Sequence, residues 1–295
     1  MKHLFILNPM AGKGKSLKLI PEIHKIFSSL EEEYKIEITQ KPGHATEIVR
    51  EYTLKDNYRV YAVGGDGTLN EVLNGIVDTN SSIAVIPAGS GNDFIKSITE
   101  TPKKDILYRT IKGKEQPIDI GIINDQYFLN VASLGIDAKI VFNAKHLKKL
   151  PFFNGFMAYY LSILYTIFNF NSENLTVKID DNEFNTTSLL IAFGNGSYYG
   201  GGMKVLPNAE VADGFLEVCH VKALKKFKML RFFPLVIKGK HESLTEYVSF
   251  YKCKTTEVSC DKPMPINIDG ELAFHSKISV KILPNKINFV IPEAL

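Results

Sequence analysis

The sequence predicts an α/β protein with two domains, and three observations support this prediction. A chain of 295 residues is long for a single hydrophobic core. In residues 1–124, short apolar runs alternate with segments of helical periodicity, a pattern typical of a parallel sheet with helices on both faces. Over residues 125–284, short strand-like segments separated by turn residues predominate, which indicates an antiparallel β-sandwich.

The first half shows the alternation in a regular order. Strands are expected at residues 3–8, 34–39, 58–63 and 82–86, and helices at residues 16–30, 45–52 and 69–77. The last of these helices has a continuous apolar stripe made of Leu69, Val72, Leu73, Ile76 and Val77. In parallel sheets of this kind, ligands bind at the carboxyl ends of the strands, so the residues after each strand are candidates for a site.

The stretch Gly64-Gly65-Asp66-Gly67-Thr68 joins the third strand to the third helix. Its three glycines permit positive φ and let a ligand approach the bare backbone. The first N–H groups of the following helix have no partner within that helix, which makes this end a natural phosphate site. An acid beside a phosphate site is typical of a bridging divalent cation. A glycine turn that binds nothing explains less well why strand, turn, acid and helix coincide.

The loop after the first strand, residues 8–16, ends in Gly-Lys-Ser and suggests a P-loop. The match fails because the first glycine of that motif would fall at Pro9, which lacks an N–H and fixes φ. Lys13 or Lys15 can still supply positive charge to a phosphate. For Lys15, the alternative of a solvated surface lysine is an equally good interpretation.

The loop after the fourth strand, residues 87–93, is a second turn of small residues followed by Asn92 and Asp93. Asp93 either caps the helix expected from about residue 94 or shares a metal ion with Asp66. Because the two acids follow neighbouring strands, the shared metal or metal–water network is the sharper interpretation.

Composition narrows the classes of function. The net charge of +3 is too small to predict a nucleic-acid partner, and the 45% hydrophobic and 23% charged residues are ordinary for a soluble globular protein. Cys219, Cys253 and Cys260 lack metal-ligand spacing and cannot all pair, which favours a reducing, cytoplasmic compartment. The apolar part of residues 1–7 is too short for a signal peptide and fits a first strand.

In the second half, strands are expected at residues 175–179, 188–193, 215–221, 246–251, 255–259, 266–269 and 278–283. Residues 151–170 contain no charged residue and approach the length of a membrane span. Because polar residues interrupt them, a core helix is favoured over a span. A helix that lines an acyl-chain groove is a third interpretation.

Residues 222–240 contain seven lysines and arginines and no acid, interleaved with apolar and aromatic residues. One interpretation is a solvated basic helix face over ordinary core residues. The other is transient contact with an anionic membrane surface, to which each cation contributes about 1 kcal/mol. The sequence does not decide between them.

The glycine turn, with Asn8-Pro9 upstream and residues 87–93 downstream, resembles the catalytic domain of the diacylglycerol kinase and lipid kinase family. In length the chain is similar to soluble bacterial diacylglycerol kinases. The order and spacing of the motifs are specific, and further matching residues are Asp119, Gly200-Gly201-Gly202-Met203, Asp213-Gly214 and Asp269-Gly270-Glu271.

The resemblance implies a fold and a division of the chain. Residues 1–124 would form a Rossmann-like nucleotide-binding domain similar to those of phosphofructokinases and NAD kinases. Residues 125–284 would form a β-sandwich that binds the lipid acceptor, and residues 285–295 a C-terminal strand that packs back on the first domain.

The resemblance also implies which residues bind ATP and metal. Nucleotide contacts would come from Asn8, Pro9, Gly12, Lys13, Thr39, Gly64, Gly65, Asp66, Gly67, Thr68, Glu71, Ser90 and Asn92. Magnesium would be held, directly or through water, by Asp66, Asp93 and Asp119. A second, structural magnesium would be held by Asp213 with backbone oxygens near Glu210 and Phe215.

Residues 268–271 place two carboxylates around a glycine at the end of a predicted strand. On its own, Asp-Gly is a strong hairpin signal. In the family, an acid of this motif is proposed as general base for the lipid hydroxyl, which implies Asp269 or Glu271 without choosing between them. Together with Asp66, these acids are the predicted catalytic residues.

The sequence therefore predicts an ATP-dependent lipid kinase of phospholipid biosynthesis, cytoplasmic and peripheral at the inner face of the membrane. Diacylglycerol is the leading acceptor, while sphingoid bases, ceramide, phosphatidylglycerol and monoacylglycerol stay open, as does a homodimer. One alternative is an NAD kinase-like phosphotransferase, which shares the Gly-Gly-Asp-Gly turn. Another is a regulator that binds nucleotide or lipid without catalysis.

Overall fold

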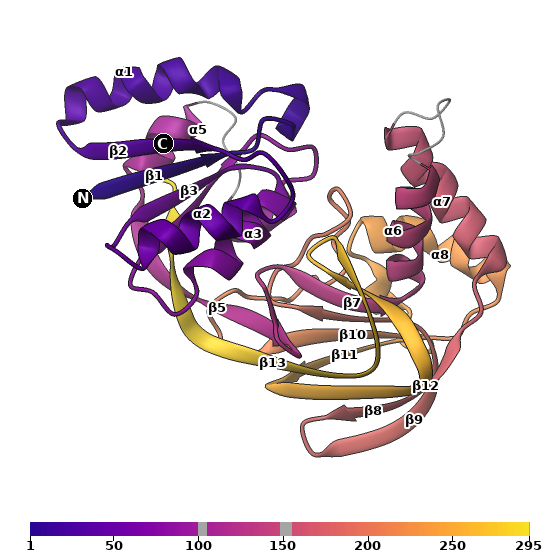
Figure 1. Ribbon diagram of the computed structural model, residues 1–295. Helices are drawn as coiled ribbons and strands as arrows, with labels where there is room; N and C mark the ends of the chain where they lie inside the picture. Colours follow the sequence, from indigo (N-terminus) through magenta and orange to yellow (C-terminus); the bar gives the residue numbers. More distant parts are fainter. Residues whose placement is uncertain (100–104, 148–154, 295) are drawn as a thin grey trace. The chain divides into compact units, whose positions relative to one another are not determined.

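The computed structural model describes residues 1–99, 105–147 and 155–294, with their side chains except at 145–160. The chain divides into two compact units (Figure 1). Unit 1 consists of Met1–Ile120, Val211–Gly214 and Leu283–Leu295, and unit 2 of Gly121–Glu210 and Phe215–Ile282. Unit 1 thus includes a short segment, Val211–Gly214, from the second half of the chain. No sequence pattern predicts that this segment belongs to unit 1.

Unit 1 contains a parallel sheet in the order β4-β3-β1-β2. The strands are β1 (Lys2–Leu7), β2 (Glu33–Ile38), β3 (Arg59–Gly64) and β4 (Ser82–Pro87). The end of β13 (Glu271–Ile291) extends this sheet, since Asn288 and Phe289 pair in parallel with Ser82 and Ile83 of β4. The strands predicted from the first half are therefore present, in parallel, at nearly the expected residues.

Helices cover both faces of this sheet (Figure 1). They are α1 (Ile20–Leu30), α2 (His44–Thr53), α3 (Asp66–Ile76), α4 (Asp93–Ile98) and α5 (Ile106–Ile111). Ile23 and Phe27 of α1 pack on Phe5 and Tyr61 at one face. The helix predicted from residue 16 begins as α1 only at Ile20, because Pro21 occupies its first turn, the position where proline is tolerated.

Unit 2 is built from strands that pair antiparallel wherever a pairing within the unit is described. They are β6 (Gln126–Phe128), β7 (Val131–Gly135), β8 (Glu173–Ile179), β9 (Asn182–Gly194), β10 (Leu216–Lys222), β11 (Val248–Cys253) and β12 (Thr255–Ile268). β5 (Lys114–Ile123) and β13 run through both units.

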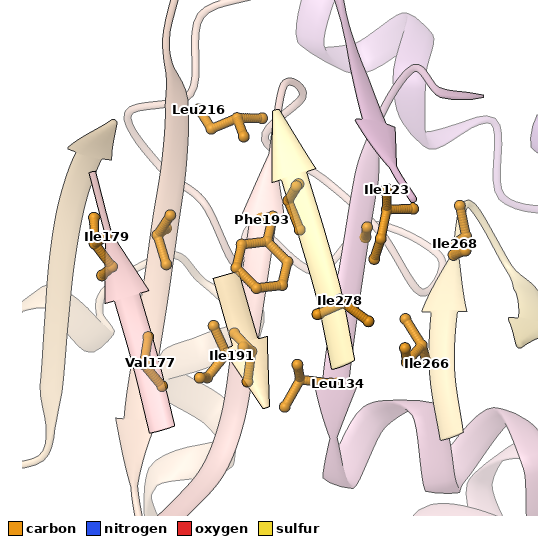
Figure 2. Close-up of a cluster of buried hydrophobic side chains, with 14 of the residues drawn as sticks. Ile123, Leu134, Val177, Ile179, Ile191, Phe193, Leu216, Ile266, Ile268 and Ile278 are labelled. Atoms are coloured by element: carbon orange, nitrogen blue, oxygen red, sulfur yellow. The ribbon is translucent and has the colours of Figure 1, made fainter. Parts of the chain in front are cut away.

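The long strands β9 and β12 each pair with β8 along one part and with β7 along another, so they wrap around a buried core. Figure 2 shows this core, with Phe193, Ile191 and Ile266 among its members. The two strands predicted at 255–259 and 266–269 are one strand. The break between them is a shift of register between Ser259 and Met264, as at a β-bulge.

Three helices of unit 2 lie together beside the strands (Figure 1): α6 (Ile136–Leu147), α7 (Gly155–Asn169) and α8 (Lys226–Ile237). α7 buries Ile163 and Ile167 in a core cluster. It is therefore a core helix, as the sequence favoured, although Phe152 and Phe153 of the predicted segment lie outside the described residues. None of the described helices is long and apolar enough to cross a membrane.

Candidate functional site

Three loops of unit 1 meet where β1, β3 and β4 end. The side-chain amide of Asn8 donates a hydrogen bond to Thr68 Oγ1 at 3.1 Å, which joins the first loop to the start of α3. The N–H groups of Ala88 and Gly89 both donate to the carbonyl of Gly64, at 2.8 and 3.0 Å. We call this set of contacts the glycine edge, made of residues 8–14, 64–68 and 88–93.

The glycines of the glycine edge are required by close approach. A Cβ atom on Gly64 would lie 2.3 Å from Thr68 Oγ1, and one on Gly89 would lie 2.4 Å from the Cα of Gly65. Gly12 has φ +55°, and a Cβ there would lie 2.2 Å from a backbone oxygen of the third loop. Side chains are thus excluded, and the polar groups that the edge offers to a ligand come mainly from the backbone.

Asp66 links the second and third loops. It is the first residue of α3, and its Oδ1 accepts the N–H groups of Asp93 and Phe94 at 2.7 and 3.2 Å. Asp66 therefore caps α4, the role that the sequence suggested for Asp93; α4 begins at Asp93 itself. The carboxylate of Asp93 instead accepts a hydrogen bond from Lys96 Nζ at 2.7 Å.

The two acids form a close carboxylate pair. Burial raises the pKa of Asp66, and the negative charge of Asp93 raises it further. The second oxygen of Asp66, Oδ2, lies 2.9 Å from the position that a Cβ on Gly91 would take, so glycine leaves that oxygen uncovered. A divalent cation held at these oxygens would relieve the repulsion within the pair.

Other residues predicted to bind nucleotide support the loops instead. Asn92 closes its own turn, because its side chain exchanges hydrogen bonds with the backbone of Gly89 at 2.9 and 3.0 Å. Glu71 accepts the N–H of Ala45 at 3.1 Å, at the start of α2. Thr39 is buried, and its N–H donates to the carbonyl of Leu7 at 2.9 Å. Of the remaining predicted residues, Lys13 and Ser90 are exposed at the edge.

Asp119 is placed elsewhere in unit 1. It is fully buried, and its two oxygens accept the N–H groups of Gly214 and Asn285 at 2.7 and 2.8 Å. Its own N–H donates to the carbonyl of Val211 at 2.7 Å. The carboxylate thereby ties together three segments far apart in sequence, because buried backbone N–H groups require acceptors.

The three acids of the predicted catalytic metal set do not form one group. Over residues 1–99, 105–147 and 155–294, no group of three or more His, Cys, Asp or Glu side chains could hold a metal ion. The structure brings Asp66 and Asp93 together but does not group Asp119 with them. The structural magnesium at Asp213, with backbone oxygens near Glu210 and Phe215, stays a prediction; the side chain of Glu210 pairs with Lys252 at 3.8 Å.

In unit 2, the structure separates the two acids between which the sequence did not choose. Asp269, at φ +48°, accepts three backbone N–H groups at the start of β7, from Leu129, Asn130 and Val131 at 2.8–3.1 Å. Glu271 is the first residue of β13 and is exposed. The carboxylate of Asp269 is thus committed to the backbone, whereas that of Glu271 is accessible to a substrate.

Comparison with known proteins decides the family. Residues 2–123 match the model of the diacylglycerol kinase catalytic domain, and residues 130–291 match that of the YegS C-terminal NAD kinase beta sandwich-like domain. The chain belongs to the diacylglycerol kinase and YegS-like lipid kinase family. A diacylglycerol kinase of Staphylococcus carnosus is 30% identical over 273 residues, which covers 90% of this chain and 87% of the relative.

Two further comparisons extend along nearly the whole chain. A probable lipid kinase, YegS-like, of Chromohalobacter salexigens is 29% identical, over 95% of this chain and 91% of its own. The crystal structure of a diacylglycerol kinase from Bacillus anthracis superposes with a TM-score of 0.72 at 22% identity, covering 98% of this chain and 96% of its own. This protein is therefore a kinase by family, with the fold of its relatives.

This kinase carries a basic and apolar surface on α8. Lys226 and Arg231 are exposed there, together with Phe227 (77% exposed), Leu230 and Ile237. The opposite side of α8 is turned inward, with Met229 in a buried cluster. The basic segment predicted at 222–240 thus includes a helix at Lys226–Ile237 with a buried apolar side and an outer face that combines cations with exposed apolar groups.

An apolar cavity lies beneath α8, and no sequence pattern predicts it. It has a volume of about 110 Å³ and lies among α6, α7, α8 and strands of unit 2. Its walls come from residues scattered between positions 136 and 248, most of them ordinary core residues. A sequence pattern could not have marked the cavity, because no short segment contributes more than a few of its side chains.

Proposed function

We propose that this kinase transfers the γ-phosphoryl group of ATP to the hydroxyl group of a membrane lipid, with diacylglycerol as the first candidate acceptor. The proposal depends above all on the glycine edge, where three loops present bare backbone beside the Asp66–Asp93 pair. Such an arrangement suits the phosphates of a nucleotide and their cation. The relatives that carry the names diacylglycerol kinase and lipid kinase supply the acceptor class.

Magnesium is proposed at Asp66 and Asp93. The pair fits a hard cation, because it offers two carboxylates, because burial and then the charge of Asp93 raise the pKa of Asp66, and because Gly91 leaves Asp66 Oδ2 uncovered. Bound there, the ion would neutralise negative charge on the transferring phosphoryl group. Asp66 Oδ1 is meanwhile fixed by two N–H groups of α4, so the orientation of the carboxylate is set before any ligand binds.

Glu271 is the proposed general base. A base must have a lone pair that can accept the proton of the acceptor hydroxyl, and it must be reachable by substrate. Asp269 meets the first condition less well, since three backbone N–H groups already donate to its oxygens. We assign Asp269 to holding the turn that carries Glu271, and proton removal to Glu271.

The outer face of α8 is the proposed contact with an anionic bilayer. Residues 222–240 carry seven cations and no acid, so their charge complements that of acidic lipids. Phe227 and Leu230 are exposed on the same helix and would enter the interface. Replacing Lys226 and Arg231 by glutamate should abolish co-sedimentation with vesicles that contain phosphatidylglycerol; undiminished co-sedimentation would exclude this surface.

The test of the function is transfer of labelled γ-phosphate from Mg-ATP to a panel of lipids in mixed micelles. We expect labelled phosphatidic acid from the wild type and none from Asp66→Asn or Glu271→Gln, both checked for folding by thermal unfolding. Phosphorylation of another lipid would retain the reaction and change the acceptor. Phosphorylation of NAD instead, or of no acceptor, would overturn the proposal.

A further inference from the structure

The apolar cavity of unit 2 contains an unsatisfied polar group. Its walls are mainly hydrocarbon and include Ile163, Leu190, Met203, Met229 and Phe233. Well-packed interiors hold few voids larger than a water molecule, so a cavity of about 110 Å³ in such a wall is unusual. An apolar void of this kind accepts hydrocarbon rather than water.

Two residues of the wall contain a buried polar atom that has no hydrogen-bond partner among the described residues, Asp137 at Oδ1 and His241 at Nδ1. Asp137 is the second residue of α6 and is 7% exposed. Its Oδ2 accepts hydrogen bonds from the hydroxyl of Ser133 and, at 3.5 Å, from the side-chain amide of Asn267. Its Oδ1 is buried and has no hydrogen-bond partner among the described residues. A buried polar atom without a partner is rare in native proteins and indicates a group that is absent until a ligand binds.

The protonation of Asp137 decides what the missing partner must be. Burial raises the pKa of this carboxyl, although the hydrogen bond from Ser133 opposes the rise. A protonated carboxyl carries its proton on the oxygen that does not accept donors, which here is Oδ1. Asp137 therefore presents an O–H donor to the cavity, and a donor in an apolar wall requires an acceptor such as a carbonyl oxygen.

The same polar group is connected to the turn that carries the proposed base. Asn267, which donates to Asp137, accepts the N–H of Gly270 through its own Oδ1 at 2.9 Å. Asn267 also pairs with Ser133 across β12 and β7, so these two side chains are fixed on one sheet, and Asp137 lies at the start of α6, which follows β7 directly. A ligand carbonyl bonded to Asp137 would thus be registered against the turn of Asp269 and Glu271.

We propose that the cavity binds the start of an acyl chain of the acceptor lipid and that Asp137 donates a hydrogen bond to its ester carbonyl, so that acyl esters are preferred to alkyl ethers. This inference rests on the proposed lipid kinase function. Met203 and Met229 in the wall have unbranched side chains that can rearrange around the rest of the chain. An ether oxygen at the same place is a poorer acceptor and lies one atom away from the carbonyl position.

The test measures binding without ATP, so that it does not depend on catalysis. Short-chain monoacylglycerol and the alkyl glyceryl ether of equal length are titrated against the full chain by calorimetry. We expect the wild type to bind the ester about tenfold more tightly than the ether, the size of one good hydrogen bond. Equal affinities, or no binding of either ligand, would overturn the inference.

Three variants sharpen the result. Asp137→Leu should bind ester and ether equally, whereas Asp137→Asn should keep the preference because its amide N–H can still donate. Ile163→Phe should weaken both ligands by filling the cavity, and the exposed Asp181→Asn is the matched control. A preference that survives in Asp137→Leu, or unchanged binding in Ile163→Phe, would contradict the proposal.

The outcomes also separate this inference from the function on which it rests. If the ester preference depends on Asp137 while no lipid is phosphorylated, the cavity assignment holds and the kinase proposal fails. If lipids are phosphorylated but esters and ethers bind alike, the kinase proposal holds and the role of Asp137 fails.

Discussion

The glycine edge of unit 1 and the cavity of unit 2 are both candidate ligand sites, yet they are built in opposite ways. At the edge, three short loops exclude side chains, and backbone groups supply most of the polar surface. In the cavity, side chains from distant residues form an apolar wall, in which Asp137 and His241 each contain a buried polar atom without a described partner. The first kind of site depends on local turn geometry, and the second on packing between elements far apart in sequence.

This difference predicts that replacing a single side chain in unit 2 can strongly reduce activity. The largest reduction should come from replacing Glu271. Glu271→Gln should lower the rate of phosphoryl transfer by about 10²- to 10⁴-fold, the usual contribution of a general base. Because the side chain of Glu271 is exposed, the Glu271→Gln variant should have the same free energy of unfolding as the wild type. Initial rates with Mg-ATP and diacylglycerol, together with urea unfolding, measure both effects.

Asp269→Asn is the matched control, since it changes the neighbouring acid. It should lower the free energy of unfolding by about 1–3 kcal/mol, because an amide nitrogen then faces backbone N–H groups that need an acceptor. Asparagine tolerates the positive φ at this position, so backbone strain does not confuse the result. Full stability in Asp269→Asn, or full activity in Glu271→Gln, would reverse the two assignments.

In unit 1 the backbone forms most of the proposed site, so a single added methyl group should lower both stability and ATP binding. Gly64→Ala places a Cβ 2.3 Å from Thr68 Oγ1 and should cost about 1–3 kcal/mol of unfolding free energy, with weaker ATP binding. Gly67→Ala is the control, because no described atom lies within 4 Å of its added Cβ. Calorimetric unfolding with and without ATP measures both; equal behaviour of the two variants would show that the edge is not tightly packed.

The same contrast explains what the sequence could and could not predict. The three loops of the edge are local patterns, and the alternation of strands and helices places them at one end of a parallel sheet, so their meeting could be foreseen. The position of Asp119 could not, since its acceptor role depends on N–H groups at residues 214 and 285. Asp137 was missed for a related reason: an acid after a strand has no sequence signal that distinguishes a buried site from a helix start.

A buried acid of the sandwich should make the free energy of unfolding depend on pH. Burial raises the pKa of Glu217 in β10, which is 3% exposed, to about 7, and the charge of Glu242 contributes. The unfolded chain binds a proton less readily than the native state in this range, so the free energy of unfolding should fall as pH rises from 4.5 towards 7 and then level off.

Glu217→Gln should remove that decline, which we expect to amount to about 3 kcal/mol. Urea unfolding of both proteins across this pH range gives the difference between them, in which the contributions of other groups cancel. The exposed Glu183→Gln serves as control and should follow the wild type. A wild-type profile that runs parallel to that of Glu217→Gln would mean that Glu217 is not buried as a neutral acid.

The smallest effect is expected from lysine side chains at the glycine edge, because there the backbone provides most of the phosphate contacts. Lys13 lies within the loop that approaches Ala88, whereas Lys15 follows it, and both side chains are exposed. Lys13→Ala should raise the KM for ATP about three- to tenfold, as expected for one exposed charge on a phosphate, and Lys15→Ala should leave it unchanged. Steady-state kinetics at low ionic strength gives the comparison. A larger loss in Lys13→Ala than in Gly64→Ala would show that side-chain charge, and not the backbone, dominates the edge.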